Sequence, residues 1–198
     1  MSTAAIVLAA GGSTRLGRPK QLVDLDGRPM LERVITDVAG WPVDEVLVVL
    51  GADAEEILDA VDVGAATVVL NPEWETGSAS SLRAGLDLLT RGRAERAFVV
   101  LGDEPAIPDE VPAALLDALA ERRTPAAAPV YRYQRGTPIL VDRSLWARLM
   151  SLDGDVEPGR LFDAHPEWVT DVRVDHLPPR DVDTEDDVAD LDAGRRTR

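Results

Sequence analysis

The chain has 198 residues and no cysteine, which excludes disulfides, thiolate metal ligands and cysteine nucleophiles. Aromatic residues make up only 4% of the sequence and apolar residues 45%, so the core must consist mainly of Ala, Val, Leu and Ile. Positive charge is also scarce, because 36 acidic residues stand against 21 basic ones and give a net charge of −15. Such a chain repels phosphate backbones and anionic lipids, which argues against nucleic-acid and membrane partners.

Long apolar runs are absent too. No segment has 18 consecutive apolar residues, and no basic region precedes the short apolar run near the N-terminus. We therefore expect a cytoplasmic protein. The length suits one domain of ordinary size, which we place at residues 1–191, with a flexible tail at 192–198.

Apolar runs alternate with amphipathic stretches along the chain. Strands are expected at Ala4–Ala10, Glu45–Leu50, Ala66–Leu70, Ala97–Leu101, Ala126–Val130 and Val169–Val174. Apolar residues at helical spacing predict helices around 31–38, 82–89 and 111–119, and a weaker pattern predicts an antiparallel strand at 136–141 and a short helix at 143–150. This alternation predicts an α/β fold: a doubly wound, mostly parallel Rossmann-like sheet with helices on both faces.

Lys20 is the only lysine in the chain, since every other basic side chain is arginine. It ends a glycine-rich segment, Gly11–Lys20, which follows the first expected strand and also contains Arg15 and Arg18. Glycines let backbone N–H groups approach an anion closely, and a lysine supplies a compact point charge. The glycines alone fit a plain strand-to-helix turn, but the three cations in an acidic chain favour an anion site.

The segment Leu8–Lys20, Leu-Ala-Ala-Gly-Gly-Ser-Thr-Arg-Leu-Gly-Arg-Pro-Lys, resembles the signature loop of the MobA-like nucleotidyltransferases, which include molybdenum cofactor cytidylyltransferases. Four later segments resemble further blocks of that family in the same order: Gly77–Gly85, Leu101–Pro105, Gly136–Pro138 and Asp181–Asp186. The resemblance covers residues 4 to about 190. It implies a nucleotide-diphospho-sugar transferase-like fold.

The resemblance also implies roles for particular residues. It assigns catalysis to Lys20, Arg15 and Asp103. It assigns the magnesium ion, Mg²⁺, to Asp103 and Asp183. It assigns nucleotide binding to Leu8, Ala9, Ala10, Gly11, Gly12, Lys20, Ser78 and Ser81. Ala10 matches the cytidylyl form of the loop, whereas guanylyl members usually have Gly there, so CTP is the expected nucleotide.

The same residues have simpler interpretations. Asp103 could cap the following helix, and the acidic cluster around Asp183 suits a helix N-terminus. Ser78, Ser80 and Ser81 could each be an N-cap. Trp74 could line the site or anchor its loop. His165 and His176 lack the carboxylate pattern of a zinc site, so we interpret them as surface or packing residues.

Two blocks depart from the family pattern. Glu104 stands where cytidylyltransferases commonly have Met or Gln, and the segment 154–160 differs from the family's block at that place. The departures concern the half of the site that binds the acceptor.

These features predict a Mg²⁺-dependent transfer of CMP from CTP to a phosphorylated acceptor, with the molybdopterin form of the molybdenum cofactor as the implied acceptor. A molybdoenzyme or its chaperone is then the implied downstream partner. Two rivals remain: an NAD(P)H-dependent reductase that uses the same crevice, and a non-catalytic chaperone that binds nucleotide or cofactor. The absence of Gly-x-Gly-x-x-Gly counts against the reductase.

Overall fold

The computed structural model describes residues 1–122, 124–132, 134–155 and 162–179, and residues 182, 184, 187 and 188. The longer strands are β1 (Thr3–Leu8), β4 (Glu45–Leu50), β5 (Thr67–Leu70), β6 (Arg96–Leu101), β7 (Ala126–Tyr131), β9 (Ile139–Asp142) and β10 (Val169–Val174). The short strands are β2 (Asp24–Leu25), β3 (Arg28–Pro29) and β8 (Gln134–Arg135). The α-helices are α1 (Met30–Ala39), α2 (Ala54–Ala60), α3 (Ser78–Thr90), α4 (Glu110–Arg122) and α5 (Trp146–Leu149). Short 3₁₀ turns are η1 (Lys20–Leu22), η2 (Trp74–Thr76), η3 (Arg143–Leu145) and η4 (Pro166–Trp168).

Eight strands form one sheet in the order β10-β7-β9-β6-β1-β4-β5, with β8 paired to β7, and β2 and β3 form a separate two-stranded sheet. Within the large sheet, as far as the structure describes it, pairs β1–β4, β1–β6, β4–β5 and β7–β10 are parallel, whereas β9 and β8 run antiparallel to their neighbours. The mostly parallel α/β sheet is therefore confirmed, as is the antiparallel strand expected near residues 136–141.

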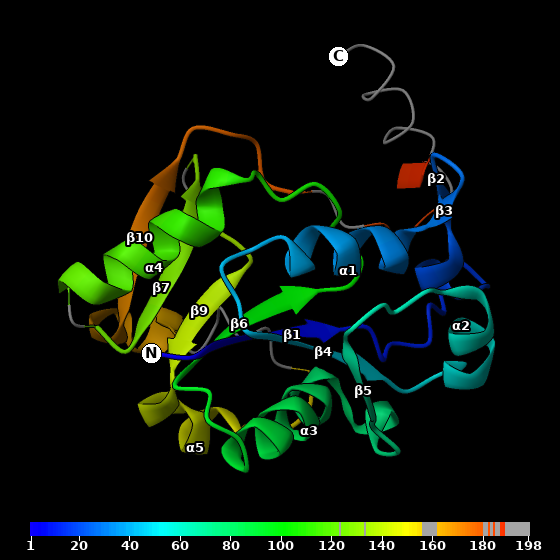
Figure 1. The fold of residues 1–198 in the computed structure, drawn as a ribbon, viewed down its shortest axis with the longest axis horizontal. Coiled ribbons are helices and arrows are strands. Elements are labelled where there is room, and N and C mark those ends of the chain that lie inside the picture. Colours follow the sequence, from blue (N-terminus) through cyan, green and yellow to red (C-terminus); the bar gives the residue numbers. More distant parts are fainter. Residues whose placement is uncertain are drawn as a thin grey trace.

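Helices cover both faces of the sheet (Figure 1). Helices α1, α2 and α4 pack on one face and α3 and α5 on the other. Strand β1 contributes to the core on both faces of the sheet. Ala5 and Val7 pack on the face covered by α1, α2 and α4, while Ala4 and Ile6 pack on the face covered by α3 and α5. This burial from two sides explains why the central strands are apolar throughout.

Two local expectations are corrected, and one helix was not expected. Strand β1 ends at Leu8, so Ala9 and Ala10 belong to the loop rather than to the strand. The stretch 143–150 divides into η3 and α5. Helix α2 was not expected: it is only seven residues long, Ile57 is its one fully buried residue, and the apolar spacing of Ala54, Ile57 and Leu58 covers little more than one turn. Within the described part of the chain, no helix is both long and apolar enough to span a bilayer.

Candidate functional site

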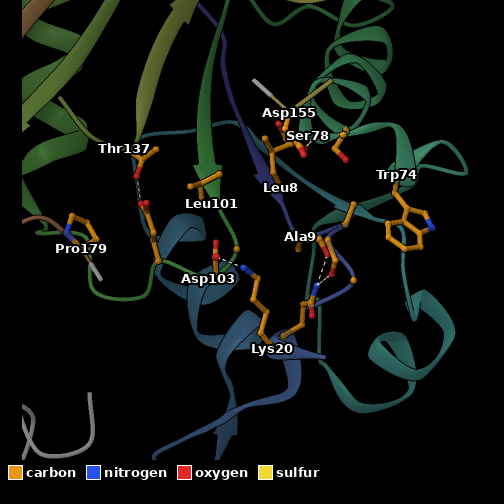
Figure 2. Close-up of a pocket in the computed structure, with 18 of the residues that line it drawn as sticks. Leu8, Ala9, Lys20, Trp74, Ser78, Leu101, Asp103, Thr137, Asp155 and Pro179 are labelled. Carbon is orange, nitrogen blue, oxygen red and sulfur yellow. Dashed lines mark hydrogen bonds and ion pairs between the residues drawn. The ribbon is translucent and has the colours of Figure 1, made fainter. Parts of the chain in front are cut away.

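A cavity of about 1040 Å³ opens where β1 and β6 end, at the carboxyl edge of the sheet. Its walls come from the loop after β1, the start of α3, the loop after β6, the segment between β8 and β9, and the pair Pro178–Pro179. In open α/β sheets ligands bind at this edge. Figure 2 shows Leu8, Ala9, Lys20, Ser78, Asp103 and Thr137 converging on it from different elements.

The loop after β1 presents backbone amides to the cavity. Ala10, Gly11 and Gly12 all line it, and among the described residues no acceptor is found for their N–H groups. Gly12 packs against Trp74, where an added Cβ would lie 3.1 Å from the indole ring. Consecutive unpaired amides at a cavity form a site for an anion, because each N–H carries a partial positive charge.

Lys20 and Asp103 meet across the cavity although 83 residues separate them in the sequence. Lys20 Nζ forms an ion pair and hydrogen bond with Asp103 Oδ2, and these side chains are 20% and 14% exposed. Asp103 does not cap a helix, since α4 begins only at Glu110. Gly102 allows this close packing of loops, because a Cβ there would lie 2.8 Å from Ala9 Cβ.

The serines at the start of α3 have separate tasks, and none of them is the N-cap, which is Gly77. Ser80 Oγ donates to the carbonyl oxygens of Glu73 and Gly77 at 3.0 and 2.8 Å, so it holds the preceding turn. Ser81 Oγ accepts from Asn71 Nδ2 at 3.0 Å and lines the cavity. Ser78 lines it as well, and its N–H donates to Asp155 Oδ1 at 3.1 Å.

Glu104 and Thr137 form the opposite wall. Glu104 is 9% exposed, and Thr137 Oγ1 donates a hydrogen bond to its Oε2. Behind them, the buried Tyr131 hydroxyl donates to the Thr137 carbonyl oxygen at 3.0 Å. Burial, and then the negative charges of Glu104 and Glu110, raise the pKa of Tyr131 above its ordinary value. Tyr131 therefore stays neutral and can act as the donor.

Arg15 and Trp74 also line the cavity. The indole of Trp74 packs over Gly51, where an added Cβ would lie only 2.5 Å from Trp74 Cβ. Trp74 thus lines the site and anchors its loop at once, so both interpretations of it hold.

The comparisons with known proteins agree with this geometry. Residues 5–169 match the model of the MobA-like NTP transferase domain. The chain belongs to that family.

Relatives span almost the whole chain. The chain is 29% identical over 187 residues to nicotine blue oxidoreductase of Paenarthrobacter nicotinovorans, which covers 90% of this chain and 91% of that protein. It is similar, with 33% identity and a TM-score of 0.87, to the solved structure of an Rv0371c homologue from Mycobacterium sp. strain JC1, covering 99% and 98% of the two chains. Rv0371c of Mycobacterium tuberculosis, solved in complex with manganese, gives 27% identity and a TM-score of 0.82 over 96% and 98%.

A divalent metal is typical of this family, and the described residues suit one that is held largely by substrate. Asp103 offers a carboxylate at the cavity wall, while no cluster of three or more ligating side chains occurs in the described part of the chain. Mg²⁺ commonly uses one or two carboxylates and takes its other ligands from phosphates and water. Asp183 lies outside the described residues, but its neighbour Val182 donates from its N–H to the Asp103 carbonyl oxygen at 3.3 Å.

All of the described residues that the sequence assigned to the site line this one cavity: Leu8, Ala9, Ala10, Gly11, Gly12, Arg15, Lys20, Ser78, Ser81 and Asp103. His165 and His176 lie elsewhere; His165 stacks on Trp168 and His176 pairs with Glu110. In the altered block 154–160, Gly154 and Asp155 are described and Asp155 lines the cavity, whereas 156–160 lie outside the described residues.

Three residues of the site were not predicted from the sequence. Gln21 is 2% exposed and bonded to the loop after β1, although as a polar residue beside Lys20 it looks like a surface position. Arg135 lines the cavity while paired with Asp163 and Asp171. Thr137 belongs to the Gly-Thr-Pro block, and that block was the one available signal for this wall.

Proposed function

We propose that this protein is a nucleotidyltransferase that transfers CMP from CTP to a phosphorylated acceptor, with the molybdopterin form of the molybdenum cofactor as the first acceptor to test. The observation that carries the proposal is the meeting of Lys20 and Asp103 opposite a loop of unpaired amides in one cavity. A triphosphate needs both a cationic cradle and a metal held by carboxylate; Lys20 with the amides offers the first, and the Asp103 carboxylate is a candidate ligand for the second.

In this proposal the amides of Gly11 and Gly12, with Arg15 and Lys20, hold the triphosphate. Asp103 and Asp183 would hold Mg²⁺, which neutralises the charge of the phosphates. An acceptor phosphate oxygen attacks the α-phosphorus in line, the bond from the α-phosphorus to the bridging oxygen breaks, and pyrophosphate leaves with the electron pair. The residues contribute positioning and charge, since phosphoryl transfer needs little covalent help from a protein.

Two features support a pyrimidine nucleotide. Ala10 matches the cytidylyl form of the loop, where guanylyl-type members usually have Gly. Ser81 is 5% exposed at the cavity, and its oxygen accepts from Asn71, which orients the hydroxyl proton away from that amide. We expect this buried hydroxyl to hydrogen-bond the edge of the base, and a base that leaves it unpaired loses about 1–3 kcal/mol.

A second candidate is a reductase, and a specific observation favours it: the relative that matches over 187 residues is named an oxidoreductase. A reductase would bind NADH or NADPH in the same cavity. The non-catalytic chaperone remains a third outcome, which would bind CTP and release no pyrophosphate.

The test is a pyrophosphate-release assay with ATP, CTP, GTP and UTP, each with Mg²⁺ or Mn²⁺, against molybdopterin cofactor and simpler phosphorylated acceptors. We expect release with CTP at a kcat/KM at least about tenfold above that with GTP. Release with GTP alone would overturn the cytidylyl assignment. Binding of NADH or NADPH, without pyrophosphate release, would favour the reductase instead.

A further inference from the structure

The loop after β1 turns its carbonyl groups inward. Every carbonyl oxygen from Leu8 to Gly11 accepts a hydrogen bond from within the protein. The donors are Gly102 N to Leu8 O at 2.9 Å, Gln21 Nε2 to Ala9 O at 2.7 Å, Ala52 N to Ala10 O at 3.1 Å, and Gln21 Nε2 to Gly11 O at 3.2 Å. One side chain therefore supplies two of the four bonds.

The orientation of these carbonyls decides where the amides point. In a planar trans peptide the C=O of one residue and the N–H of the next point in opposite directions. Fixing Ala9 C=O inward therefore turns the N–H of Ala10 outward, and fixing Gly11 C=O does the same for Gly12. The N–H of Gly11 depends instead on the bond from Ala52 to Ala10 O.

The loop needs such a restraint because Gly11 and Gly12 have no Cβ and can rotate freely. A rotated peptide would present a carbonyl oxygen to the cavity, and that oxygen would repel a phosphate. Gln21 is itself held in place: it is 2% exposed, and its Oε1 accepts from Ser13 Oγ at 3.4 Å, while Ser13 Oγ accepts from Lys20 N at 2.9 Å.

We propose that Gln21 is the positioning residue of the anion-binding loop: its carboxamide fixes two carbonyls and thereby aims the N–H groups of Ala10 and Gly12 at a phosphate. The inference rests on the proposed function only in taking a phosphate as the ligand. In this proposal Gln21 orients the N–H groups of Ala10 and Gly12, and the backbone N–H of Ala52 orients that of Gly11.

Calorimetry with inorganic pyrophosphate, in the absence of metal, tests this assignment. Gln21→Met keeps the volume and removes both donors, so we expect at least about tenfold weaker binding. Leu22→Met, in the same 3₁₀ turn, is the matched control and should bind within about twofold of the parent, because Leu22 donates no side-chain hydrogen bond. Equal affinity in Gln21→Met and the parent would overturn the proposal.

A second readout separates positioning from general damage. In ¹⁵N-labelled parent protein, pyrophosphate should shift the N–H signals of Ala10, Gly11 and Gly12. In Gln21→Met the shifts at Ala10 and Gly12 should shrink, while the shift at Gly11 persists. A uniform loss at all three amides would overturn the specific role of Gln21.

Should Gln21→Met not fold, Gln21→Leu also removes both donors without adding a charge, and the same two measurements apply. The parent titration needs no variant, and unmoved signals at Ala10 and Gly12 would also overturn the proposal. Pyrophosphate binding without nucleotidyl transfer from any nucleotide would leave this inference standing and overturn the proposed function.

Discussion

At the scale of single residues, Lys20 joins the amide loop to the acidic wall of the cavity. Lys20→Ala should lower turnover by about 100-fold or more, because the charge that develops on the leaving phosphates loses its partner. Lys20→Arg should also be impaired, since a planar guanidinium cannot replace a compact ammonium against Asp103. Steady-state pyrophosphate release measures both, with thermal unfolding as the control for folding. Comparable turnover in Lys20→Ala would sink the assignment.

The ion pair between Lys20 and Asp103 competes with the proposed ligands, because a phosphate that binds Lys20 and a Mg²⁺ ion that binds Asp103 each take one residue from its partner. Asp103→Asn removes the carboxylate charge, so Lys20 becomes available to phosphates and metal-free CTP should bind about two- to tenfold more tightly. The extra affinity that Mg²⁺ confers on CTP should shrink in the same variant. Calorimetry with and without Mg²⁺ measures both changes. If Asp103→Asn gains from Mg²⁺ as much as the parent does, Asp103 is not a metal ligand.

The sequence predicted residues with a chemical signature and missed those defined by contacts. The lone lysine, the glycines and an aspartate at a strand end all follow from charge and backbone freedom. Gln21 has no such signature, because its role depends on two carbonyl oxygens that only the folded loop brings within reach. Glu104 was noticed only as a departure from the family pattern, and its bond to Thr137 bridges 33 positions.

At the scale of elements, Gly77 joins the start of α3 to the segment at Gly154. Its φ is +115°, and an added Cβ would lie 2.3 Å from the Gly154 carbonyl carbon. Gly77→Ala should therefore lower the free energy of unfolding by about 2–4 kcal/mol. Gly92→Ala is the matched control, since the nearest atom lies 3.5 Å from its added Cβ, and it should change stability by less than about 0.5 kcal/mol. Denaturant unfolding of the two variants and the parent measures these changes. If Gly77→Ala were as stable as the parent, the predicted clash would be contradicted.

The wall built from β7 and the segment before β9 should be sensitive to alkaline pH. The pKa of Tyr131 lies above its ordinary value of 10.0 in the folded protein. Above about pH 10 the unfolded chain releases this proton and the folded one retains it, so stability falls as pH rises; below that pH the group has no effect on the slope. Tyr131→Phe should flatten the fall between pH 9 and 11 relative to the parent. Urea unfolding at these pH values measures the free energy of unfolding of both proteins. If it fell equally steeply with pH in Tyr131→Phe and in the parent, the prediction would be contradicted.

The strands and long helices were predictable because their patterns are strong. Val169–Val174 and Glu45–Leu50 match the observed strands, and the sheet buries both faces as their composition requires. Helix α2 was missed because its apolar spacing, Ala54, Ile57 and Leu58, covers little more than one turn and is too short to stand out. The order of the strands was also beyond sequence reasoning, since it places β9 between β6 and β7 through contacts remote along the chain.

At the scale of the whole molecule, a few cations face the cavity of a strongly acidic chain. Arg15, Lys20 and Arg135 line the cavity together with the acidic Glu75, Asp103, Glu104 and Asp155, in a chain whose net charge is −15. The overall charge and the local charge act in opposite directions. The acidic residues of the whole chain repel one another and any nucleotide, while the basic side chains around Lys20 attract phosphates. Added salt screens both, so the two effects can be separated by measuring stability and affinity on the same protein.

Raising KCl from about 0.01 to 0.3 M shortens the screening length from about 30 Å to below 8 Å, which suppresses the long-range repulsion among the 36 acidic residues. The Tm should therefore rise by a few degrees. Over the same range the affinity for metal-free pyrophosphate should fall, because its contacts with Lys20 and Arg15 are attractive and are screened as well.

Choline chloride in place of KCl is the control for specific cation binding and should give the same trends. A Tm that falls with both salts would mean that the ion pairs stabilise the fold more than the net charge destabilises it. An affinity that rises with salt would mean that the overall negative field, rather than the cluster around Lys20, governs anion binding.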